Sequence, residues 1–485
     1  MKLNEIFARY GRTDLYSLGV ADNGRNSMRS YQNIWAAWYK GYVPSFHRYK
    51  RYNGQKMIWL KHRSMDMAKT VCEDWASLLL NEKTEVKLGD AAAQKVIDDI
   101  FAANNFWQEA NQGLEKAFAL GIGAFVIRVD KLDFDADGVI VDNSAAKHKI
   151  EFVNGQKIYP FTIDDKTITE CAFATKGGDT INISLHLLNE AGNYVIYNIR
   201  GKVDKQGSIS YDADQDVYAF DTGSNIPWFQ ILKPNLSNNI DIDSPLGISV
   251  FANATDALET VDLIFDAFGG EYDLGRKRVY ISAEAITVTE NGETRITFDP
   301  NDIAYYVLPY GNGVIGSDGG KPYVQESTGE LRADALVTGI NQALNILSTK
   351  VGLGENRYRF DKGGITTATQ DISENSSMFR NVRRHEILIE QVLIDLVRTI
   401  LYAINAFTPQ SVNENVDITV NFDDSIIEDK AAERTRDLSE VAQGLMEKWE
   451  FRVKWYGEDE ATAKAWQEAK AASVPRLSDI YNGEE

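Results

Sequence analysis

The chain has 485 residues, of which 44% are hydrophobic and 25% are charged, so a mostly disordered protein is excluded. Its 71 acidic residues outnumber 51 basic residues, and the formal net charge of −20 argues against a generic basic coat for nucleic acid. At roughly 100–200 residues per domain, this length predicts two to four domains.

The residues that carry most catalytic and metal chemistry are sparse. Cys72 and Cys171 are far apart, which predicts neither a disulfide framework nor a zinc or redox motif. The five histidines form no pair at metal-ligand spacing, and no nucleophile–base arrangement can be assembled from them. We therefore expect no metal, no cofactor and no enzymatic activity. The amino terminus lacks a signal peptide's apolar core, and no apolar run reaches the roughly 20 residues of a membrane span, so no membrane partner is expected.

The positive charge is concentrated at the start of the chain. Residues 1–70 contain 13 Lys and Arg against four Asp and Glu, whereas the remainder contains 38 against 67. Aromatic residues interleave with these cations between Tyr31 and Arg63, a mixture that suits stacking and phosphate contacts with nucleic acid. Trp and Tyr also fill cores beneath Lys and Arg stems, and we favour that interpretation for most rings. The cations left as candidates for contact with DNA or a neighbouring subunit are Lys40, Arg48, Lys50 and Arg51.

Helices are predicted first, at residues 64–80, 91–104 and 106–120. Short β-like runs separated by turn residues then occupy about 122–233, for example GAFVIRVD and INISLHLL. Asp243-Ser244-Pro245 is a helix-start signal, with Ser244 as the cap and proline in the first turn. We therefore expect a helix over 244–276, which Gly269-Gly270 weakens or ends.

Two apolar stripes at helical spacing bracket a β-like module at 277–330. The first stripe includes Phe251, Leu258, Phe265 and Phe268, and the second, in a helix at 331–351, includes Leu336, Ile340 and Leu347. A loop, GLGENRYRFDKGG, follows at 352–364. A long helix at about 373–407 and a charged helical tail from residue 428 complete the chain.

Three motif matches carry little chemistry. Gly311, Gly313 and Gly316 fit a dinucleotide fingerprint, but no helix can open after them, so a loop or hairpin is expected. The acidic run at 133–138 resembles the start of a calcium loop but lacks the final Glu, which favours a hairpin turn. Arg380, Arg383 and Arg384 share one helix face and would contact either DNA phosphates or acids of a neighbouring segment or subunit.

This order of elements resembles the portal protein of tailed double-stranded DNA bacteriophages, of the long-tailed siphovirus type. The stretches that carry the resemblance are WAAWYKGYVPSFHRY (35–49), PWFQILKPNLSNNIDIDSPLGISVFANATDALETVDLIFDAF (227–268) and GLGENRYRFDKGGITTATQDISENSSMFRNVRRHEILIEQVL (352–393). The resemblance covers nearly the whole chain and is most specific over 227–400. It rests on pattern and order, because none of these stretches is a catalytic motif.

The resemblance implies an α+β portal fold in one interleaved subunit. Its parts would be a mainly helical wing (1–243) with a β-rich insertion at about 122–233, two stem helices (244–276 and 331–351), a small α/β clip (277–330), a tunnel loop (352–365), a long helix returning to the wing (366–427) and a helical crown (428–485). The stem stripes would then pack against neighbouring copies. The tunnel-loop residues that would touch DNA are Asn356, Arg357, Tyr358 and Arg359; the open alternative is that these arginines meet acids on the adjacent subunit.

The resemblance also implies partners and a location. They are a homo-oligomeric ring, typically of twelve, double-stranded DNA passing through its channel, the terminase large subunit, a head-completion or adaptor protein, and the major capsid and scaffold proteins. The protein would lie at the capsid portal vertex of the virion after assembly in the host cytoplasm. An acidic ring suits this role, because a channel with few phosphate contacts lets DNA slide. The alternative is another virion structural protein without a DNA channel; a carboxylate-based glycoside hydrolase ranks third, since no carboxylate pair stands out.

Overall fold

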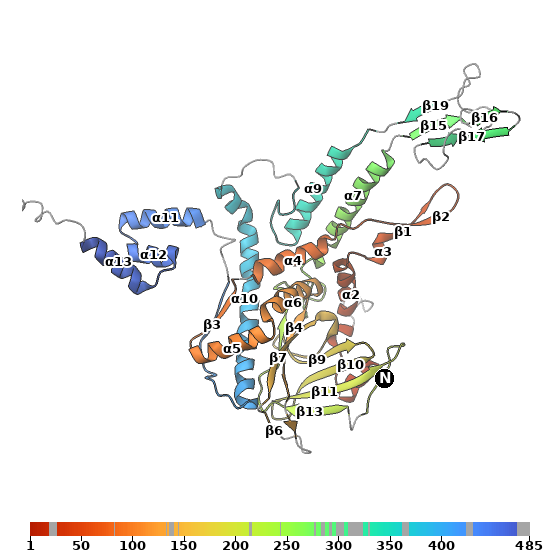
Figure 1. The fold of residues 1–485 in the computed structure, drawn as a ribbon. Helices are drawn as coiled ribbons and strands as arrows, with labels where there is room; N and C mark the ends of the chain where they lie inside the picture. The colour runs from red at the N-terminus through yellow and green to blue at the C-terminus, as the bar shows by residue number, and fades with distance from the viewer. Residues whose placement is uncertain are drawn as a thin grey trace, which may run out of the picture.

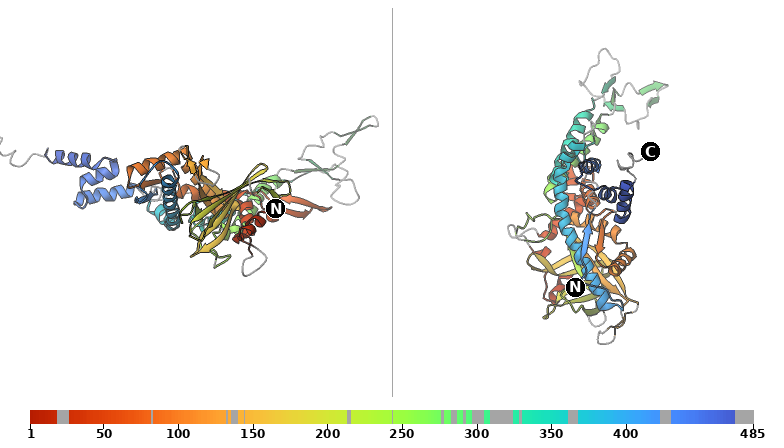
Figure 2. Two further views of the ribbon diagram at one scale, coloured as in Figure 1. Left: turned by 90° about the horizontal axis from the view of Figure 1, so that it is seen from below. Right: turned by 90° about the vertical axis from the view of Figure 1, so that its left-hand side faces the viewer.

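The protein is elongated, with a pair of helices and short strands projecting from one end of the main body and a further group of helices beside it (Figure 1, Figure 2). The computed structural model describes residues 1–18, 27–81, 83–131, 133–134, 140–143, 145–212, 216–242, 244–275, 278–282, 287–290, 293–296, 305–308, 324–327, 330–360, 368–422 and 430–472.

The body is built around the long helix α10 (Ala368–Phe407), whose apolar stripe includes the buried Leu393, Leu396 and Ile400. Shorter helices pack against it and against one another, and they enclose the main core with Trp35 and Trp75. The predicted helices at 64–80, 91–104 and 106–120 are confirmed. The shorter helices are α2 (Met28–Tyr39), α4 (Met67–Leu79), α5 (Ala91–Ala103) and α6 (Phe106–Leu120).

Antiparallel sheets occupy the other side of the body, as the alternating runs at 122–233 predict. A three-stranded sheet has the order β14-β4-β7, and a larger one the order β12-β11-β10-β9-β8 with β13 paired to β11. The chain is therefore α+β, as expected. The strands are β4 (Gly123–Asp130), β5 (Asp133–Phe134), β6 (Ile140–Asp142), β7 (Lys147–Asn154), β8 (Ile158–Asp164), β9 (Thr167–Gly177), β10 (Thr180–Leu188), β11 (Tyr194–Val203), β12 (Ile209–Ser210), β13 (Val217–Asp221) and β14 (Phe229–Leu232), with the 3₁₀ turn η2 (Gly155–Lys157).

The first helix belongs to this larger sheet. Helix α1 (Leu3–Arg9) packs Ile6 and Phe7 against it in a second, smaller apolar cluster. The 3₁₀ turn η1 (Leu15–Ser17) follows.

A two-stranded hairpin leaves the body after the short helix α3 (Pro44–His47). Its strands are β1 (Arg48–Tyr52) and β2 (Met57–Lys61), paired antiparallel from Arg48–Lys61 to Tyr52–Met57. Asn53 closes the loop by accepting hydrogen bonds from the backbone of Gln55 and Lys56, and Gly54 has a φ of 94°. The hairpin points away from the body, beside the projecting helices (Figure 1).

The projecting helices are α7 (Thr255–Leu274) and α9 (Ala333–Lys350), which pack side by side. The prediction that the first of them starts at residue 244 is wrong. Residues 244–250 are not helical, and the 3₁₀ turn η3 (Ala252–Ala254) precedes α7. The amide of Val250 donates to the Phe118 carbonyl at 2.9 Å, and a Cβ on Gly247 would lie 1.9 Å from the Gly121 carbonyl oxygen. This segment is therefore committed to packing against the end of α6.

Of the two alternatives for Gly269-Gly270, the ending of the helix is wrong, because α7 continues through both glycines to Leu274, close to the expected end at 276. A Cβ at Gly269 would lie 1.9 Å from a guanidinium nitrogen of Arg63. Glycine here gives room for an arginine to cross the helix.

Short strands lie between α7 and α9, as predicted for 277–330. Strand β15 pairs parallel to β18 and antiparallel to β19, and β16 pairs with β17. The strands are β15 (Arg278–Ser282), β16 (Thr287–Glu290), β17 (Glu293–Ile296), β18 (Tyr305–Leu308) and β19 (Val324–Ser327). Gly311, Gly313 and Gly316 lie outside the described residues.

After α9, residues 352–360 are neither helix nor strand, as predicted, and α10 begins at residue 368, somewhat before the predicted 373. Strand β20 (Ile418–Asn421) returns to pair with β3 (Glu85–Leu88). The helical tail is also confirmed. Its helices, drawn in blue at the left of Figure 1, are α11 (Lys430–Gln443), α12 (Lys448–Tyr456) and α13 (Glu460–Ala472).

Candidate assembly and DNA-contact surfaces

The apolar stripes of α7 and α9 are largely used inside the subunit. Phe251, Leu258, Ile340 and Leu347 are buried in the chain's own main core, so the expectation that they pack against a neighbouring copy is wrong. A stripe at helical spacing marks a buried face but does not say which chain covers it. The other stripe residues, Phe265, Phe268 and Leu336, are only partly buried and keep some surface available.

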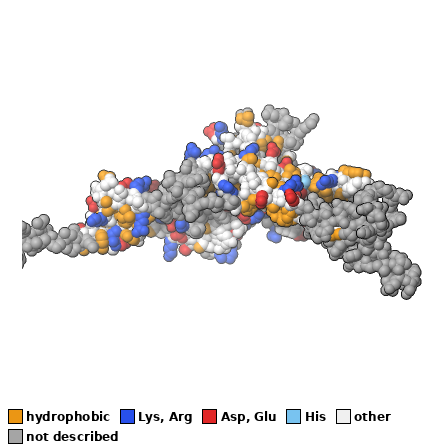
Figure 3. Space-filling view, turned by 90° about the horizontal axis from the view of Figure 1, so that it is seen from above, with side chains coloured by type: hydrophobic (Ala, Val, Ile, Leu, Met, Phe, Trp, Pro, Cys, Tyr) orange, Lys and Arg blue, Asp and Glu red, His pale blue; other side chains and the backbone are white. Residues whose placement is uncertain are grey.

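A different set of apolar side chains is exposed on and beside the helix pair. Leu263 on α7 is 44% exposed and Ile346 on α9 is 54% exposed, and neither belongs to the predicted stripes. Leu331 and Val337 are also exposed, as is Tyr272, the last residue of the first predicted stripe. Exposed apolar side chains grouped on neighbouring helices are typical of an interaction surface. Seen from above, the surface mixes both charges with hydrophobic patches (Figure 3).

The hairpin carries the cations selected from the sequence. Arg48 lies 4.1 Å and Lys50 4.7 Å from the centre of the Trp59 ring, so both cations stack on one exposed indole. Arg51 points to the opposite face of the hairpin, because side chains alternate along a strand. Lys40 is exposed at the end of α2. Of the rings interleaved with these cations, Trp35 and Trp38 are core residues as favoured, whereas Tyr52 and Trp59 are exposed.

The base of the hairpin is fixed to α7 by two carboxylates, one buried and one partly exposed. Asp262 accepts hydrogen bonds from His47 Nε2 at 3.0 Å and from the Met65 backbone at 2.7 Å, and these two residues flank the hairpin in sequence. One turn along, Asp266 Oδ2 lies 3.0 Å from Nδ1 of His62. The hairpin therefore has a fixed attachment to the projecting helix.

Arg63 extends this attachment. Its guanidinium crosses α7 at Gly269 and donates to Asp273 at 2.9 Å. The sequence analysis missed both the hairpin and its attachment. Asn-Gly between two strand-like runs at residues 53–54 is a hairpin signal that could have identified the first. Nothing local in the sequence relates His47 to Asp262.

The loop after α9 contains the four residues predicted to touch DNA, and their side chains have different environments. Arg357 lies 3.3 Å from Asp74 of the same subunit. Tyr358 packs against the core, and burial followed by the charge of Asp74 raises the pKa of its phenol well above the usual range. Asn356 takes a positive φ of 62°, with its amide donating to Asn345. Arg359 is exposed. Residues 361–365 lie outside the described part of the chain.

The arginines on α10 also differ from one another. Arg383 pairs with Glu386 on the same helix at 3.3 Å, which is neither the contact with DNA nor the contact with a neighbouring segment or subunit that the sequence suggests. Arg380 and Arg384 are exposed. Next to them, His385 is buried against Trp75 and accepts a hydrogen bond from the Asn235 amide at 3.0 Å, so it is a packed core histidine. Burial, followed by the charge of Arg384, lowers the pKa of His385 to about 3.

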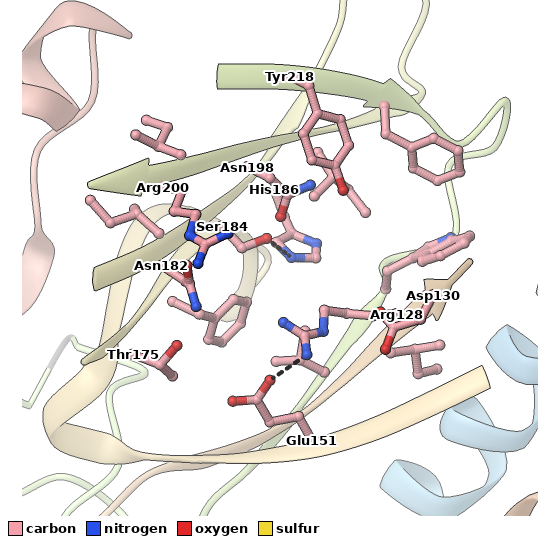
Figure 4. A pocket seen from close by; sticks show the side chains of 18 of the residues that line it. Arg128, Asp130, Glu151, Thr175, Asn182, Ser184, His186, Asn198, Arg200 and Tyr218 are labelled. Atoms are coloured by element: carbon pink, nitrogen blue, oxygen red, sulfur yellow. Dashed lines mark hydrogen bonds and ion pairs between the residues drawn. The ribbon is translucent and has the colours of Figure 1, made fainter. Parts of the chain in front are cut away.

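A cavity of about 550 Å³ lies between the two sheets of the body (Figure 4). Arg128 and Glu151 face each other at 3.4 Å on its lower side, and Ser184 contacts His186 Nε2 at 3.1 Å on the other. Burial lowers the pKa of His186 to about 3, and its Nδ1 has no hydrogen-bond partner. A weak base with no group to orient it does not activate a serine, so this pair lacks the features of a nucleophilic site.

Other kinds of site have little support within the described residues. No group of three or more His, Cys, Asp or Glu is placed to hold a metal ion there. In that same part, no helix combines the length and the apolar character needed to cross a membrane. Strands β5 and β6 pair at the acidic run, but residues 135–139 are outside the description.

Comparison with known proteins identifies the family. The model of the family described as "Phage portal protein, SPP1 Gp6-like" matches residues 60–476. The chain therefore belongs to the SPP1 Gp6-like family of phage portal proteins, which confirms the resemblance seen over 227–268 and 352–393. Residues 35–49 precede the matched range. No curated protein matches the chain.

Solved structures with a similar chain include necks of gene transfer agent (GTA) particles. The neck of the native particle, computed with C12 symmetry, is 9% identical with a TM-score of 0.40. The neck of the empty particle, computed with C6 symmetry, is 10% identical with a TM-score of 0.42. Each match covers 80% of this chain and 88% of the other.

Proposed function

We propose that this protein forms a ring at one vertex of a phage capsid, through which DNA is packaged and later ejected. The observation that carries the proposal is membership of the portal family over residues 60–476. The exposed apolar residues on α7 and α9, including Leu263 and Ile346, support assembly into a ring, because a lone subunit leaves them in water. We take twelve as the number of subunits.

In this proposal α7 and α9 are the stem, and the strands β15–β19 between them are the clip. The clip would protrude from the capsid and meet the terminase large subunit first and a head-completion or adaptor protein afterwards. The body would be the wing, in contact with the major capsid and scaffold proteins. Helices α11, α12 and α13 would be the crown, inside the head. The loop between α9 and α10 would line the channel.

The net negative charge of the chain suits a channel through which DNA moves better than a protein that binds DNA tightly. Each ion pair between DNA phosphate and Lys or Arg strengthens binding, and strong binding would stop movement. In the described part of the loop, Arg357 is already paired with Asp74, which leaves Arg359 as the exposed cation nearest the channel in this proposal. Arg380 and Arg384 on α10 are the next candidates. A few cations on an acidic ring would guide DNA without holding it.

The ring is tested by examining the purified protein. We expect ring-shaped particles with a central hole in negative-stain microscopy, and native mass spectrometry should give the subunit number. A particle of defined size without a hole would contradict the conduit and favour another virion structural role.

The clip assignment needs its own experiment. A variant lacking residues 285–325 should still form rings, since α7 and α9 are retained, but should no longer capture the terminase large subunit in a pull-down. Equal terminase capture by the variant and the full chain would refute the assignment.

A further inference from the structure

The β1–β2 hairpin has one face that the described part of its own subunit leaves exposed, apart from the Lys61 ammonium, which lies 5.1 Å from the centre of the Tyr42 ring. In the observed register Arg48 pairs with Lys61, Lys50 with Trp59 and Tyr52 with Met57, and directly paired residues share a face. All six side chains are exposed, with Tyr52 at 61% and Trp59 at 53%. The opposite face is partly covered, and there Tyr49 stacks on His62 at 4.1 Å. We call Arg48, Lys50, Tyr52, Met57, Trp59 and Lys61 the basic hairpin face.

The basic hairpin face lacks both a surface to pack against and acidic groups to pair with its cations. A two-stranded hairpin is at best marginally stable in water unless it packs against something else. The hairpin from residue 48 to residue 61 has five cations and no acid, and none of the five forms an ion pair within the described part of the chain. Its partner should therefore offer negative charge next to apolar surface.

The stem helix α7 offers such a surface. It contains six acidic residues and no Lys or Arg. Four of these acids are used within the subunit: Asp262, Asp266, Glu271 and Asp273 bind the hairpin base or Arg332. Asp256 and Glu259 form no ion pair in the described structure. They are one turn apart, and burial together with the charge of Asp256 raises the pKa of Glu259.

Leu263 continues the same side of the helix. Asp256, Glu259 and Leu263 have spacings of three and four residues, so they share one face, and the buried Leu258 and Val261 lie on another. We call Asp256, Glu259 and Leu263 the acidic helix face. It joins two unpaired carboxylates to an apolar side chain that is 44% exposed. These are the properties that the basic hairpin face requires.

The hairpin cannot easily turn back onto this surface of its own subunit. Its base is fixed to α7 through Asp262 and Asp266, and its tip points away from the helix (Figure 1). From base to tip it spans about 20 Å, at about 3.3 Å per residue. A helix pair with interaxial distances of 8–10 Å has a width of about this size. The hairpin is thus about as long as a helix pair is wide.

We propose that the basic hairpin face docks on the acidic helix face of the next copy of this chain. This inference rests on the proposed ring, in which each interface joins two unlike surfaces of adjacent subunits. Each stem helix would then hold its own hairpin by the base and the neighbour's hairpin by the tip. Exposed ion pairs contribute little individually, so burial of Trp59, Met57 and Leu263 would supply most of the affinity. The charged residues would determine which surface of the neighbouring subunit the hairpin binds.

Charge reversal with a matched control tests the proposal. Lys50→Glu alters the basic hairpin face, whereas Arg51→Glu makes the same charge change at the adjacent residue on the opposite face. We expect Lys50→Glu to raise the protein concentration needed for ring formation at least tenfold and Arg51→Glu to change it much less, as measured by mass photometry. Adding Glu259→Lys to Lys50→Glu should restore rings.

The outcomes separate this proposal from the ring itself. If the unmodified protein forms no ring, the proposed function and the docking both fail. If it forms rings and Lys50→Glu assembles like Arg51→Glu, the ring stands and the docking is refuted. Loss of assembly without rescue by Glu259→Lys would also count against the docking face.

A second experiment does not depend on a destabilised variant. Met57→Cys with Leu263→Cys places one thiol on each face, while the native Cys72 and Cys171 are buried. Under mild oxidation we expect a ladder of covalent oligomers that reducing agent removes. Each single-cysteine variant is the control. Rings that form without any cross-linked ladder would overturn the proposal.

Discussion

The imidazole of His47 and the carboxylate of Asp262 meet at 3.0 Å, although 215 positions separate them in the chain. The Val43 amide donates to His47 Nδ1 at 2.9 Å, so the ring proton is on Nε2 and is donated to Asp262. Both side chains are buried. This hydrogen-bonded histidine thereby fixes the start of the hairpin to the stem helix.

Removing this carboxylate should loosen the hairpin. Asp262→Ala leaves the buried His47 Nε2–H and the Met65 amide without acceptors, each costing about 1–3 kcal/mol of stability. Asp262→Asn keeps one acceptor oxygen and should cost less. The melting temperature should be highest for the wild type, lower for the Asn variant and lowest for the Ala variant. Limited proteolysis of the Ala variant should cut within residues 48–66. Equal melting temperatures for all three proteins would contradict this role.

Stability should fall on acidification because of two buried histidines. The pKa values of His186 and His385 are lowered from 6.5 to about 3, mainly by burial. Between these values the unfolded chain binds protons that the folded chain excludes, so stability is complete above pH 6.5 and is lost toward pH 3. Each histidine should contribute about 1.4 kcal/mol per pH unit within this window.

His385→Asn tests this pH dependence, because its side-chain oxygen can still accept from the Asn235 amide. Urea unfolding at several pH values should give a shallower loss of stability below pH 6.5 for the variant. The two proteins should have parallel curves above pH 7. Parallel curves below pH 6.5 as well would show that His385 does not set the slope.

The exposed apolar residues of the stem should matter for assembly and not for folding. Ile346→Glu puts a charge on a side chain that is 54% exposed, so the isolated subunit should melt at nearly the same temperature. In the proposed ring the charge would be buried, and the concentration for assembly should rise at least about tenfold. Ile346→Val is the conservative control. Normal assembly of the Glu variant would remove this residue from the interface.

The two loop arginines should behave differently from one another. Arg357→Ala together with Arg359→Ala should leave rings intact and reduce the length of packaged DNA. Because Arg357 is paired with Asp74, we expect most of this effect from Arg359→Ala alone. Asp74→Asn is the control for loss of the ion pair, which should cost no more than about 1 kcal/mol. Full-length packaged DNA in the double variant would refute a role for this loop.

Elements with strong local signals could be predicted from the sequence. Helix α6 and strand β4 have the bounds that their periodicity indicates, because side-chain spacing decides the structure locally. The start of α7 could not be predicted in this way. Ser244 and Pro245 form a sound helix-start signal, but the contact between Gly247 and Gly121 overrides it.

The surfaces were harder to predict than the elements. Phe251 just before α7 and Leu263 within α7 are both apolar residues, yet the first is buried in its own subunit and the second is exposed. Only the packing of α7 against α9 and the body distinguishes them. Arg357 and Arg359 likewise look equivalent in the loop sequence, and the position of Asp74 from α4 separates them.

Helix α10 connects distant parts of the subunit. Its 40 residues form one continuous rod of about 60 Å. It contacts the helices α4 and α5 and the strands β4, β14 and β20. We expect a displacement of its amino-terminal half, which carries Arg380, to move the helices and strands that pack against this one continuous helix. A contact made near Arg380 would thereby change the positions of the strands that pack against α10.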